Sequence, residues 1–209
     1  VALHHPDVTQ HLVQHAGRAA GAALLAQAVQ PVPGGGAQQP DDDFAGLTAS
    51  VEAGLPGEIA VTHAATHGDL IAGINAGQGL VNYIGHGSNE VWGGGLFDSS
   101  AALGLSNGAM TPVVLSMTCL NGYFQDIYTA PLAKALLSAP GGGAVAVWAS
   151  SGLSDAGPQA TMNQAMVKAL YDNPGMTIGQ AAAAAKSATT DKDVRRTWIL
   201  LGDPSATLH

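Results

Sequence analysis

The sequence predicts an α/β fold, a three-layer α/β/α sandwich around a mainly parallel sheet. Short, nearly continuous apolar runs recur along the chain, as expected for parallel strands that are covered on both faces. Segments with helical spacing separate these runs, and right-handed crossovers would place such helices on both sides of the sheet. The 28 glycines and the aromatic content of only 5% favour close packing of helices on the sheet over a core of large rings.

An amphipathic helix is expected first, over residues 8–29. Asp7 and Gln10 form an aspartate version of a capping box, and apolar residues follow at helical spacing as far as Ala23. Pro31 ends this pattern, because proline cannot continue a helix.

A glycine- and proline-rich connection follows over residues 31–44 and ends in an acidic turn, Asp41-Asp42-Asp43. It is the only internal boundary that the composition suggests. We therefore expect residues 1–40 to form an N-terminal helix and linker, and residues 41–209 to form one folded domain.

Apolar runs alternate with helical segments after this connection. The expected strands lie at residues 58–62, 79–84, 112–117, 144–149 and 197–201. The expected helices lie between them, at residues 69–76, 131–138, 158–171 and 177–188. Pro131 suits the first turn of its helix, and Thr177 with Gln180 caps the last one.

The charge balance and the cysteine count exclude several classes of protein. Seven basic and 15 acidic residues give a net charge of −8, which argues against a surface that follows nucleic-acid phosphates. No apolar run reaches about 18 residues, so no membrane-spanning helix is expected. The sequence starts without a basic and apolar leader, so we expect any targeting segment to be absent or already removed. Cys119 is the one cysteine, so neither an internal disulfide nor a cysteine-based zinc site can form.

Two residues with catalytic chemistry follow predicted strands directly. His86 lies between two glycines after strand 79–84, and Cys119 lies just after strand 112–117. In parallel sheets, ligands bind outside the carboxyl ends of the strands. A separation of 33 residues (119 − 86) suits one β–crossover–β unit, so the two strands could be neighbours. An imidazole beside a thiol would make it a more effective nucleophile, although each residue taken alone also suits a turn histidine or a buried core cysteine.

The sequence around these residues resembles the gingipain family of cysteine peptidases, peptidase family C25. The likeness is carried by LVNYIGHGSNEVW at 80–92 and TPVVLSMTCLNGYF at 111–124, and it continues through GGGAVAVWASSG at 141–152 and the closing TWILLGDPSATLH. It covers roughly residues 41–209 and implies a caspase-like catalytic domain there. The family's peptidase module usually has a further α/β half before this region, so residues 1–40 are interpreted as a remnant of it.

The resemblance implies a role for several residues. His86 would be the catalytic imidazole and Cys119 the nucleophile, and the backbone amides of Gly87 and Cys119 would form the oxyanion hole. The implied enzyme is a secreted or cell-surface endopeptidase that acts on proteins or peptides through a thioester. It would need no cofactor, although structural calcium is compatible with the family, and it could adjoin other domains of a larger precursor.

The remaining candidates for the site concern the substrate and the acidic partner of the histidine. The expected lining of the substrate pocket is Trp92, Asn121, Trp148, Ser150 and Ser151, with Trp148 equally suited to the core. The family's acidic partner of the histidine is not assigned: Asp41, Asp42 and Asp43 are candidates only by proximity in the sequence, and a solvated turn is the favoured interpretation of that run.

Other functions were weighed against this one. A serine hydrolase using Ser150, Asp203 and His209 would need a glycine where Trp148 stands. Histidine pairs occur at 4–5, 11–15 and 63–67, but none carries the glutamate of a zinc-binding HExxH motif. The glycine runs at 34–36, 93–95 and 141–143 lack the Lys-Ser/Thr of a phosphate-binding loop. Within the family, a transpeptidase or processing enzyme of secretion, or an inactive binding module, stays open.

Overall fold

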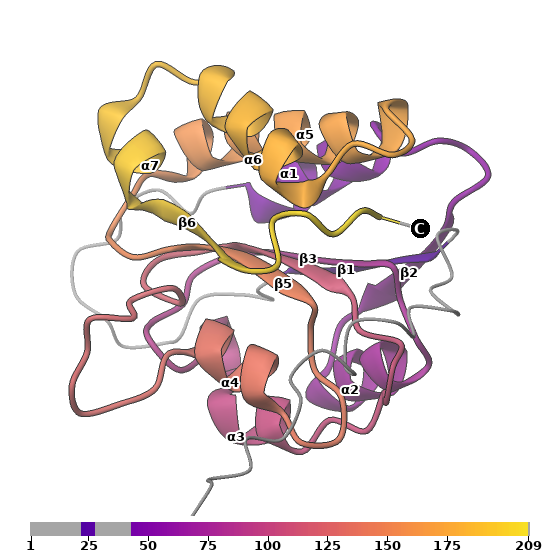
Figure 1. Cartoon of the computed structure of the whole chain (residues 1–209), viewed down its shortest axis with the longest axis vertical. Helices are drawn as coiled ribbons and strands as arrows, with labels where there is room; N and C mark the ends of the chain where they lie inside the picture. The colour runs from indigo at the N-terminus through magenta and orange to yellow at the C-terminus, as the bar shows by residue number, and fades with distance from the viewer. Residues whose placement is uncertain (1–21, 28–42, 209) are drawn as a thin grey trace, which may run out of the picture.

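The computed structural model describes residues 22–27 and 43–208 and shows the expected three-layer α/β/α sandwich (Figure 1). Six strands form one sheet in the order β2-β1-β3-β4-β5-β6. Every neighbouring pair is parallel except β5 and β6, which are antiparallel. The strands are β1 (Ala22–Gln27), β2 (Ala60–Ala64), β3 (Leu80–Ile84), β4 (Val113–Met117), β5 (Ala146–Ser150) and β6 (Trp198–Gly202).

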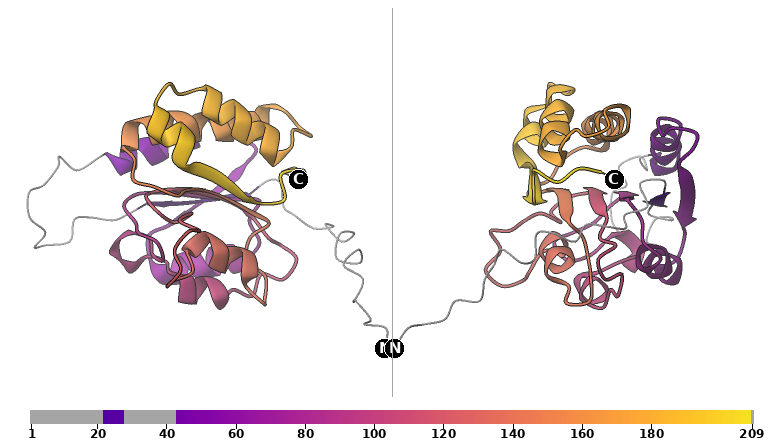
Figure 2. Two further views of the ribbon diagram at one scale, coloured as in Figure 1. Left: turned by 60° about the vertical axis from the view of Figure 1, so that its left-hand side comes forward. Right: turned by 45° about the vertical axis from the view of Figure 1, so that its right-hand side comes forward.

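Helices cover both faces of this sheet, and the two views in Figure 2 show the same layers from other directions. One face carries α1 (Phe44–Glu52), α5 (Ala156–Asp172) and α6 (Ile178–Ser187), with α7 (Lys192–Thr197) beside them at the start of β6. The other face carries α2 (His67–Asn75), α3 (Ser99–Leu103) and α4 (Leu132–Ser138). A short 3-10 turn, η2 (Gly93–Gly95), follows β3.

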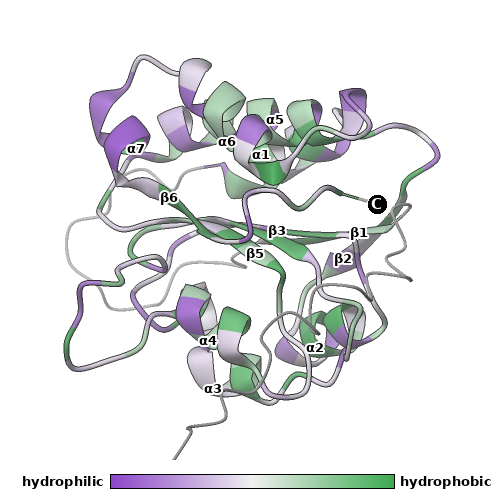
Figure 3. Ribbon diagram, in the orientation of Figure 1, coloured by the Kyte–Doolittle hydropathy of each residue, from purple (hydrophilic) through white to green (hydrophobic). Residues whose placement is uncertain are grey.

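The central strands are buried on both faces, which explains their continuous apolar runs. All five positions of β3, β4 and β5 are buried. Successive residues alternate between the two cores: Leu80 packs with the α5 side of the sheet and Val81 with the α2 side. In Figure 3 the central strands are coloured mostly as hydrophobic, whereas the helices on both sides carry hydrophobic and hydrophilic residues.

Five predicted strands and four predicted helices correspond to observed elements, with boundaries that differ by a few residues. The capping box at Thr177 and Gln180 is confirmed, with Gln180 N donating to Thr177 Oγ1 at 3.2 Å. Helices α1, α3 and α7 were not predicted from the sequence; they are short helices that begin after Asp43, Asp98 and Asp191.

The helix expected over residues 8–29 is wrong where it can be checked. Residues 22–27 form strand β1, which pairs with β2 on one side and β3 on the other. Alanine and leucine favour helices in isolation, but here burial between two strands overrides that preference, because Ala23 to Ala26 are almost inaccessible. The rest of that helix and most of the 31–44 connection lie outside the described residues. The domain division at residue 41 stays a prediction.

Candidate active site

His86 and Cys119 come from neighbouring strands and lie at the same edge of the sheet. β3 and β4 are parallel and in register, with Ile84 opposite Met117. The Gly85 N–H donates to the Met117 carbonyl at 3.2 Å, so the pairing continues to the residue before the histidine. The expectation that these strands are neighbours is confirmed.

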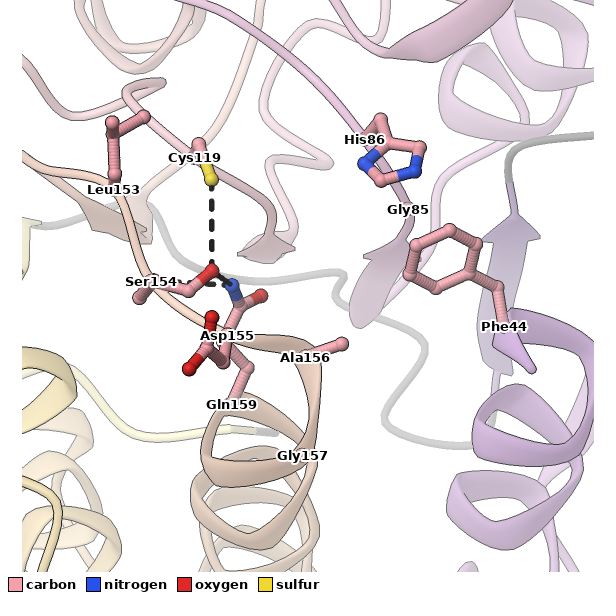
Figure 4. A pocket seen from close by; sticks show the side chains of 10 residues that line it. All are labelled: Phe44, Gly85, His86, Cys119, Leu153, Ser154, Asp155, Ala156, Gly157 and Gln159. Atoms are coloured by element: carbon pink, nitrogen blue, oxygen red, sulfur yellow. Dashed lines mark hydrogen bonds between the residues drawn. The ribbon is translucent and has the colours of Figure 1, made fainter. Parts of the chain in front are cut away.

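Both side chains line one pocket of about 490 Å³ (Figure 4). His86 is exposed and lies beside Phe44 on one side, and Cys119 is half-buried on the other side with the loop after β5. The Cys119 thiol donates to the Ser154 carbonyl at 3.7 Å. Within the described part of the chain, no hydrogen bond joins the His86 ring to the thiol. The complete lining is Phe44, Gly85, His86, Cys119, Leu153, Ser154, Asp155, Ala156, Gly157 and Gln159.

The backbone and an aromatic ring fix the position of His86. The Tyr83 hydroxyl donates to the His86 carbonyl at 2.6 Å, and the Gly93 N–H donates to the same oxygen at 2.7 Å. Burial raises the pKa of Tyr83 above its usual value, so this hydroxyl keeps its proton as a donor at every physiological pH. The Phe44 ring packs edge-on against the imidazole, with centroids 5.0 Å apart and planes at 88°.

The expected acidic partner of His86 is not found among residues 41–43 as far as the structure describes them. The Asp43 carboxylate accepts from the Gly46 N–H at 2.8 Å and caps α1. Asp41 and Asp42 lie outside the described residues. Asp43 is therefore accounted for as a helix cap.

The backbone after Cys119 adopts an uncommon conformation. Leu120 has φ +62°, the one non-glycine residue with positive φ in the described ranges. The Asn121 N–H donates to the Cys119 carbonyl at 2.8 Å, which closes a three-residue γ-turn around Leu120. Such strained residues cost about 1–3 kcal/mol and persist only where the surroundings enforce them. The Leu120 N–H is held by the Gly152 carbonyl at 3.2 Å, so the loop after β5 helps to enforce this turn.

Two backbone amides at this edge of the sheet take no part in the backbone pairing of the described residues. Neither the Gly87 N–H nor the Cys119 N–H donates a hydrogen bond within residues 22–27 and 43–208. Gly87 lies in a hairpin that is held by the residues on either side of it. The Ser88 N–H donates to the Val91 carbonyl at 2.9 Å, and the His86 carbonyl accepts from the Gly93 N–H. Free N–H groups at the end of a parallel sheet can stabilise a developing negative charge.

The structure places the five expected pocket residues elsewhere. Trp92, Trp148, Asn121 and Ser150 are at most 1% exposed, and Ser151 is half-buried with its hydroxyl donating to the Thr197 carbonyl at 2.9 Å. None of the five lines the pocket beside Cys119. The sequence suggested them because they stand near strand ends, but the backbone buries four of these side chains and directs the Ser151 hydroxyl to the Thr197 carbonyl.

Sequence reasoning missed the residues that do line the pocket. Leu153 to Gln159 follow the carboxyl end of β5, and the same rule that selected His86 and Cys119 could have selected this loop. Phe44 begins α1, far from both motifs in the sequence, and no sequence pattern signals its contact with His86.

The rival sites find no support in the described residues. His63 contacts Glu52 at 3.2 Å, whereas the His67 ring interacts with the Leu96 carbonyl at 3.1 Å, so the two histidines face different partners. No group of three or more His, Cys, Asp or Glu side chains that could hold a metal occurs in these ranges. Ser150 is buried and bonded to Gly152, and His209 lies outside the described residues.

No helix in the part of the chain that the structure describes is long and apolar enough to cross a membrane.

Comparison with known proteins bears on the family and the fold. The sequence profile of peptidase family C25 matches residues 39–209. Gingipain R2 of Porphyromonas gingivalis is 32% identical over 150 residues, which cover 66% of this chain and 20% of that protein. Gingipain R1 of the same species is also 32% identical over 150 residues, which cover 15% of its length. The chain therefore spans about a fifth or less of these relatives.

Solved structures agree as well. The Arg-specific cysteine proteinase gingipain R superposes with a TM-score of 0.71 and 25% identity, covering 90% of this chain and 47% of that one. A further structure, titled only as a protease, has a TM-score of 0.72 at 18% identity and supports the fold alone.

Proposed function

Since this chain belongs to peptidase family C25, we propose that it is a cysteine endopeptidase whose catalytic pair is His86 and Cys119. One observation carries the proposal: an exposed imidazole and a half-buried thiol from adjacent strand ends line the same pocket. The resemblance inferred from the sequence motifs is confirmed at the level of the family and the fold. The roles of the individual residues are our proposal.

The proposed reaction is acyl transfer through a thioester. The Cys119 thiolate attacks the peptide carbonyl carbon, and the carbonyl oxygen takes up the negative charge. The N–H groups of Gly87 and Cys119, which have no partner in the described residues, would stabilise that oxygen. His86, protonated, gives its proton to the leaving amine as the C–N bond breaks. Water, deprotonated by His86, then cleaves the thioester and restores the free thiol.

We further propose that the substrate residue at the cleaved bond is basic. Asp155 lies in the pocket wall, is exposed, and does not use its carboxylate to cap α5 although it occupies the N-cap position. A carboxylate that is free at a pocket wall can pair with a guanidinium or ammonium group. The gingipain R that shares this fold is described as Arg-specific, which supports the same preference here.

The setting of the enzyme is also proposed. We place it outside the cell or on the cell surface, acting on protein or peptide substrates and adjoining other domains of a larger precursor. The proposed reaction uses side chains, backbone amides and water alone, so it requires no cofactor. A calcium site stays a prediction without assigned ligands. No feature of the pocket favours transpeptidation or an inactive binding role over hydrolysis.

The test compares the wild-type chain with Cys119→Ala and His86→Ala on a mixed peptide library read by mass spectrometry. We expect each variant to lose activity by about 10³-fold or more. Native-state alkylation with iodoacetamide should modify Cys119 in the wild type. Equal cleavage by wild type and Cys119→Ala, or an unreactive thiol in the folded protein, would overturn the proposal. An added peptide amine would reveal transpeptidation through the mass of the product.

The preference for a basic residue has its own test. Asp155→Asn should lower kcat/KM for peptides cleaved after arginine or lysine by about 10- to 100-fold, because it removes one partner of an ion pair. Peptides cleaved after a neutral residue are the internal control and should be unaffected. An equal loss on both kinds of peptide would show that Asp155 does not select the side chain.

A further inference from the structure

We propose that Asn121 is a positioning residue that fixes the loop after β3 against the loop after β4, and so sets the distance between the amides of Gly87 and Cys119. The inference rests on the proposed function, because it concerns how the two halves of that site are held together. Asn121 lies two residues after Cys119 and is fully buried.

The hydrogen-bonding groups of the Asn121 side chain are used in a defined orientation. Its Oδ1 accepts from Trp92 Nε1 at 2.7 Å and from Ser116 Oγ at 2.7 Å. An indole N–H can only donate, so the atom facing Trp92 must be the oxygen of the amide. The Nδ2 group is therefore directed the other way, where it donates to the Ser88 carbonyl. The orientation of the amide follows from its partners.

The contact with Ser88 reaches the loop that carries the histidine. Ser88 directly follows Gly87, and its N–H is held in the hairpin by the Val91 carbonyl. Asn121 also donates its own N–H to the Cys119 carbonyl at 2.8 Å. A single residue thus bonds to the backbone one position beyond Gly87 and to the backbone of the proposed nucleophile.

Helix α4 holds the same two loops from a second direction. Its first two residues donate their N–H groups to carbonyls of different loops: Leu132 to Asn89 at 2.9 Å and Ala133 to Asn121 at 3.1 Å. The backbone bonds from α4 and the side-chain bonds of Asn121 therefore hold the same two loops together. The Asn121 side chain supplies the direct bond from one loop to the other.

The placement matters because oxyanion stabilisation depends on geometry. Donors are effective only when they lie about 2.7–3.1 Å from the position of the oxyanion. A misplacement of about 1 Å can cost about 10²-fold in rate. Each loop carries one of the two proposed donors, so loosening their connection should impair the chemical step while the wall around Asp155 still binds the substrate.

The test uses Asn121→Asp, with Ser116→Ala as the matched control. Asn121→Asp keeps an oxygen for Trp92 and Ser116 but replaces the donor to Ser88 with a carboxylate. We expect kcat to fall by about 10²-fold with KM changed less than about threefold. Ser116→Ala removes one contact to Oδ1 and leaves the bond to Ser88, so its kcat should stay within about threefold of wild type.

Two further readouts separate positioning from general damage. Inhibition by a peptide aldehyde, whose adduct places an oxygen anion between both amides, should weaken about as much as kcat does. Alkylation by iodoacetamide, which needs only the thiol, should keep its wild-type rate. Acidification should also raise the activity of Asn121→Asp relative to wild type, because a buried protonated carboxyl can again donate to Ser88.

If the Asn121→Asp variant does not fold, Asn121→Leu removes the bond to Ser88 without introducing a buried charge. Trp92 Nε1 still has Ser116 Oγ at 2.9 Å, so no indole donor is orphaned. Hydrogen exchange supplies a readout independent of activity. The exchange rates of the Ser88 and Gly93 amides should be at least about tenfold higher than in wild type in Asn121→Leu, and should equal those of wild type in Ser116→Ala. Wild-type kcat in both Asn121 variants, or unchanged exchange at both amides, would overturn the inference. Loss of the proposed function itself would appear differently, as an inactive wild type.

Discussion

At the scale of single residues, Gly87 has no space for a side chain. A Cβ there would lie 2.6 Å from Thr118 Oγ1 and 2.9 Å from the Val91 carbonyl oxygen. Both neighbours belong to the loops that form the proposed site. The hairpin carrying His86 therefore packs directly on the strand end that carries Cys119.

We predict that Gly87→Ala pushes these loops apart. Overpacking of this kind costs about 1–3 kcal/mol, and displacement of the Gly87 amide should lower kcat by about 10²-fold. Peptide cleavage and thermal unfolding measure the two effects. Gly57→Ala is the control, because a Cβ at Gly57 meets nothing within 4 Å and should leave both quantities near wild type. Full activity in Gly87→Ala would contradict the predicted displacement of this amide.

A second residue-scale prediction concerns Tyr171 and alkaline pH. Burial raises the pKa of Tyr171 to about 12, from its usual 10.0, and its hydroxyl has no hydrogen-bond partner among the residues that the structure describes. The pKa of Tyr171 is higher in the folded chain than in the unfolded chain, so its ionisation does not lower the free energy of unfolding below about pH 10. Between about pH 10 and 12 the free energy of unfolding falls by roughly 1.4 kcal/mol for each pH unit.

Tyr171→Phe removes both the ionisation and the unpaired hydroxyl. We expect this variant to be as stable as wild type or about 1 kcal/mol more stable at pH 8, and to lose less stability on going to pH 11. Urea unfolding at the two pH values measures this. Exposed Tyr128→Phe should behave as wild type at both. An identical alkaline decline in Tyr171→Phe and wild type would contradict the prediction.

The residue scale also shows which parts of the site can be predicted from the sequence. His86 and Cys119 were predictable because each directly follows a strand, and parallel strands in register bring their ends together. Asn121 and Trp92 stand in the same motifs, yet their side chains are buried and do not line the pocket, because the orientation of a side chain in a γ-turn or hairpin is not visible in residue spacing. Phe44 and Asp155 depend on tertiary packing of α1 and α5.

At the scale of elements, small residues allow close packing of helices on the sheet. A Cβ at Gly73 of α2 would lie 2.9 Å from the Leu24 side chain of β1. The glycine- and alanine-rich composition indicated such packing, and the capping box of Thr177 and Gln180 marked the start of α6 correctly. Strand β1 was missed because its residues favour a helix when considered locally, and only pairing with two neighbours makes them a strand.

The cap of α6 gives a prediction at this scale. Thr177→Ala removes the hydroxyl that accepts from Gln180 N–H, while the Thr177 N–H keeps Gln180 Oε1 at 3.0 Å. We expect a loss of about 1 kcal/mol, or roughly 2–4 °C in Tm, with unchanged kcat because α6 does not line the pocket. Thr177→Ser keeps the acceptor and should remain near wild type. A serine variant as unstable as the alanine one would rule out the cap as the cause.

At the scale of the whole molecule, β1 connects the β2 edge to the rest of the sheet. Five residues of β1 pair with β2 and five with β3, so β2 has no other neighbour in the sheet. Leu24 and Leu25 are at most 1% exposed and contribute to opposite cores. Burial of these two leucines alone stabilises the fold by about 3–6 kcal/mol, against a total of about 5–15 kcal/mol for a typical domain.

We therefore predict that a shortened chain of residues 43–209 does not reach the fold of the full chain. A shortened chain of residues 22–209, which keeps β1, is expected to reach it. Without β1, strand β2 and helix α2 lose the surface on which they pack, and the Phe44 contact with His86 loses its support through α1, which packs against β1. Circular dichroism melts of the two shortened chains measure this directly, with the 209-residue chain as reference. Adding the β1 peptide to residues 43–209 should restore part of the cooperative transition. If residues 43–209 alone unfold cooperatively at the reference temperature and cleave the same peptides, β1 is dispensable and the domain begins after the 31–44 connection.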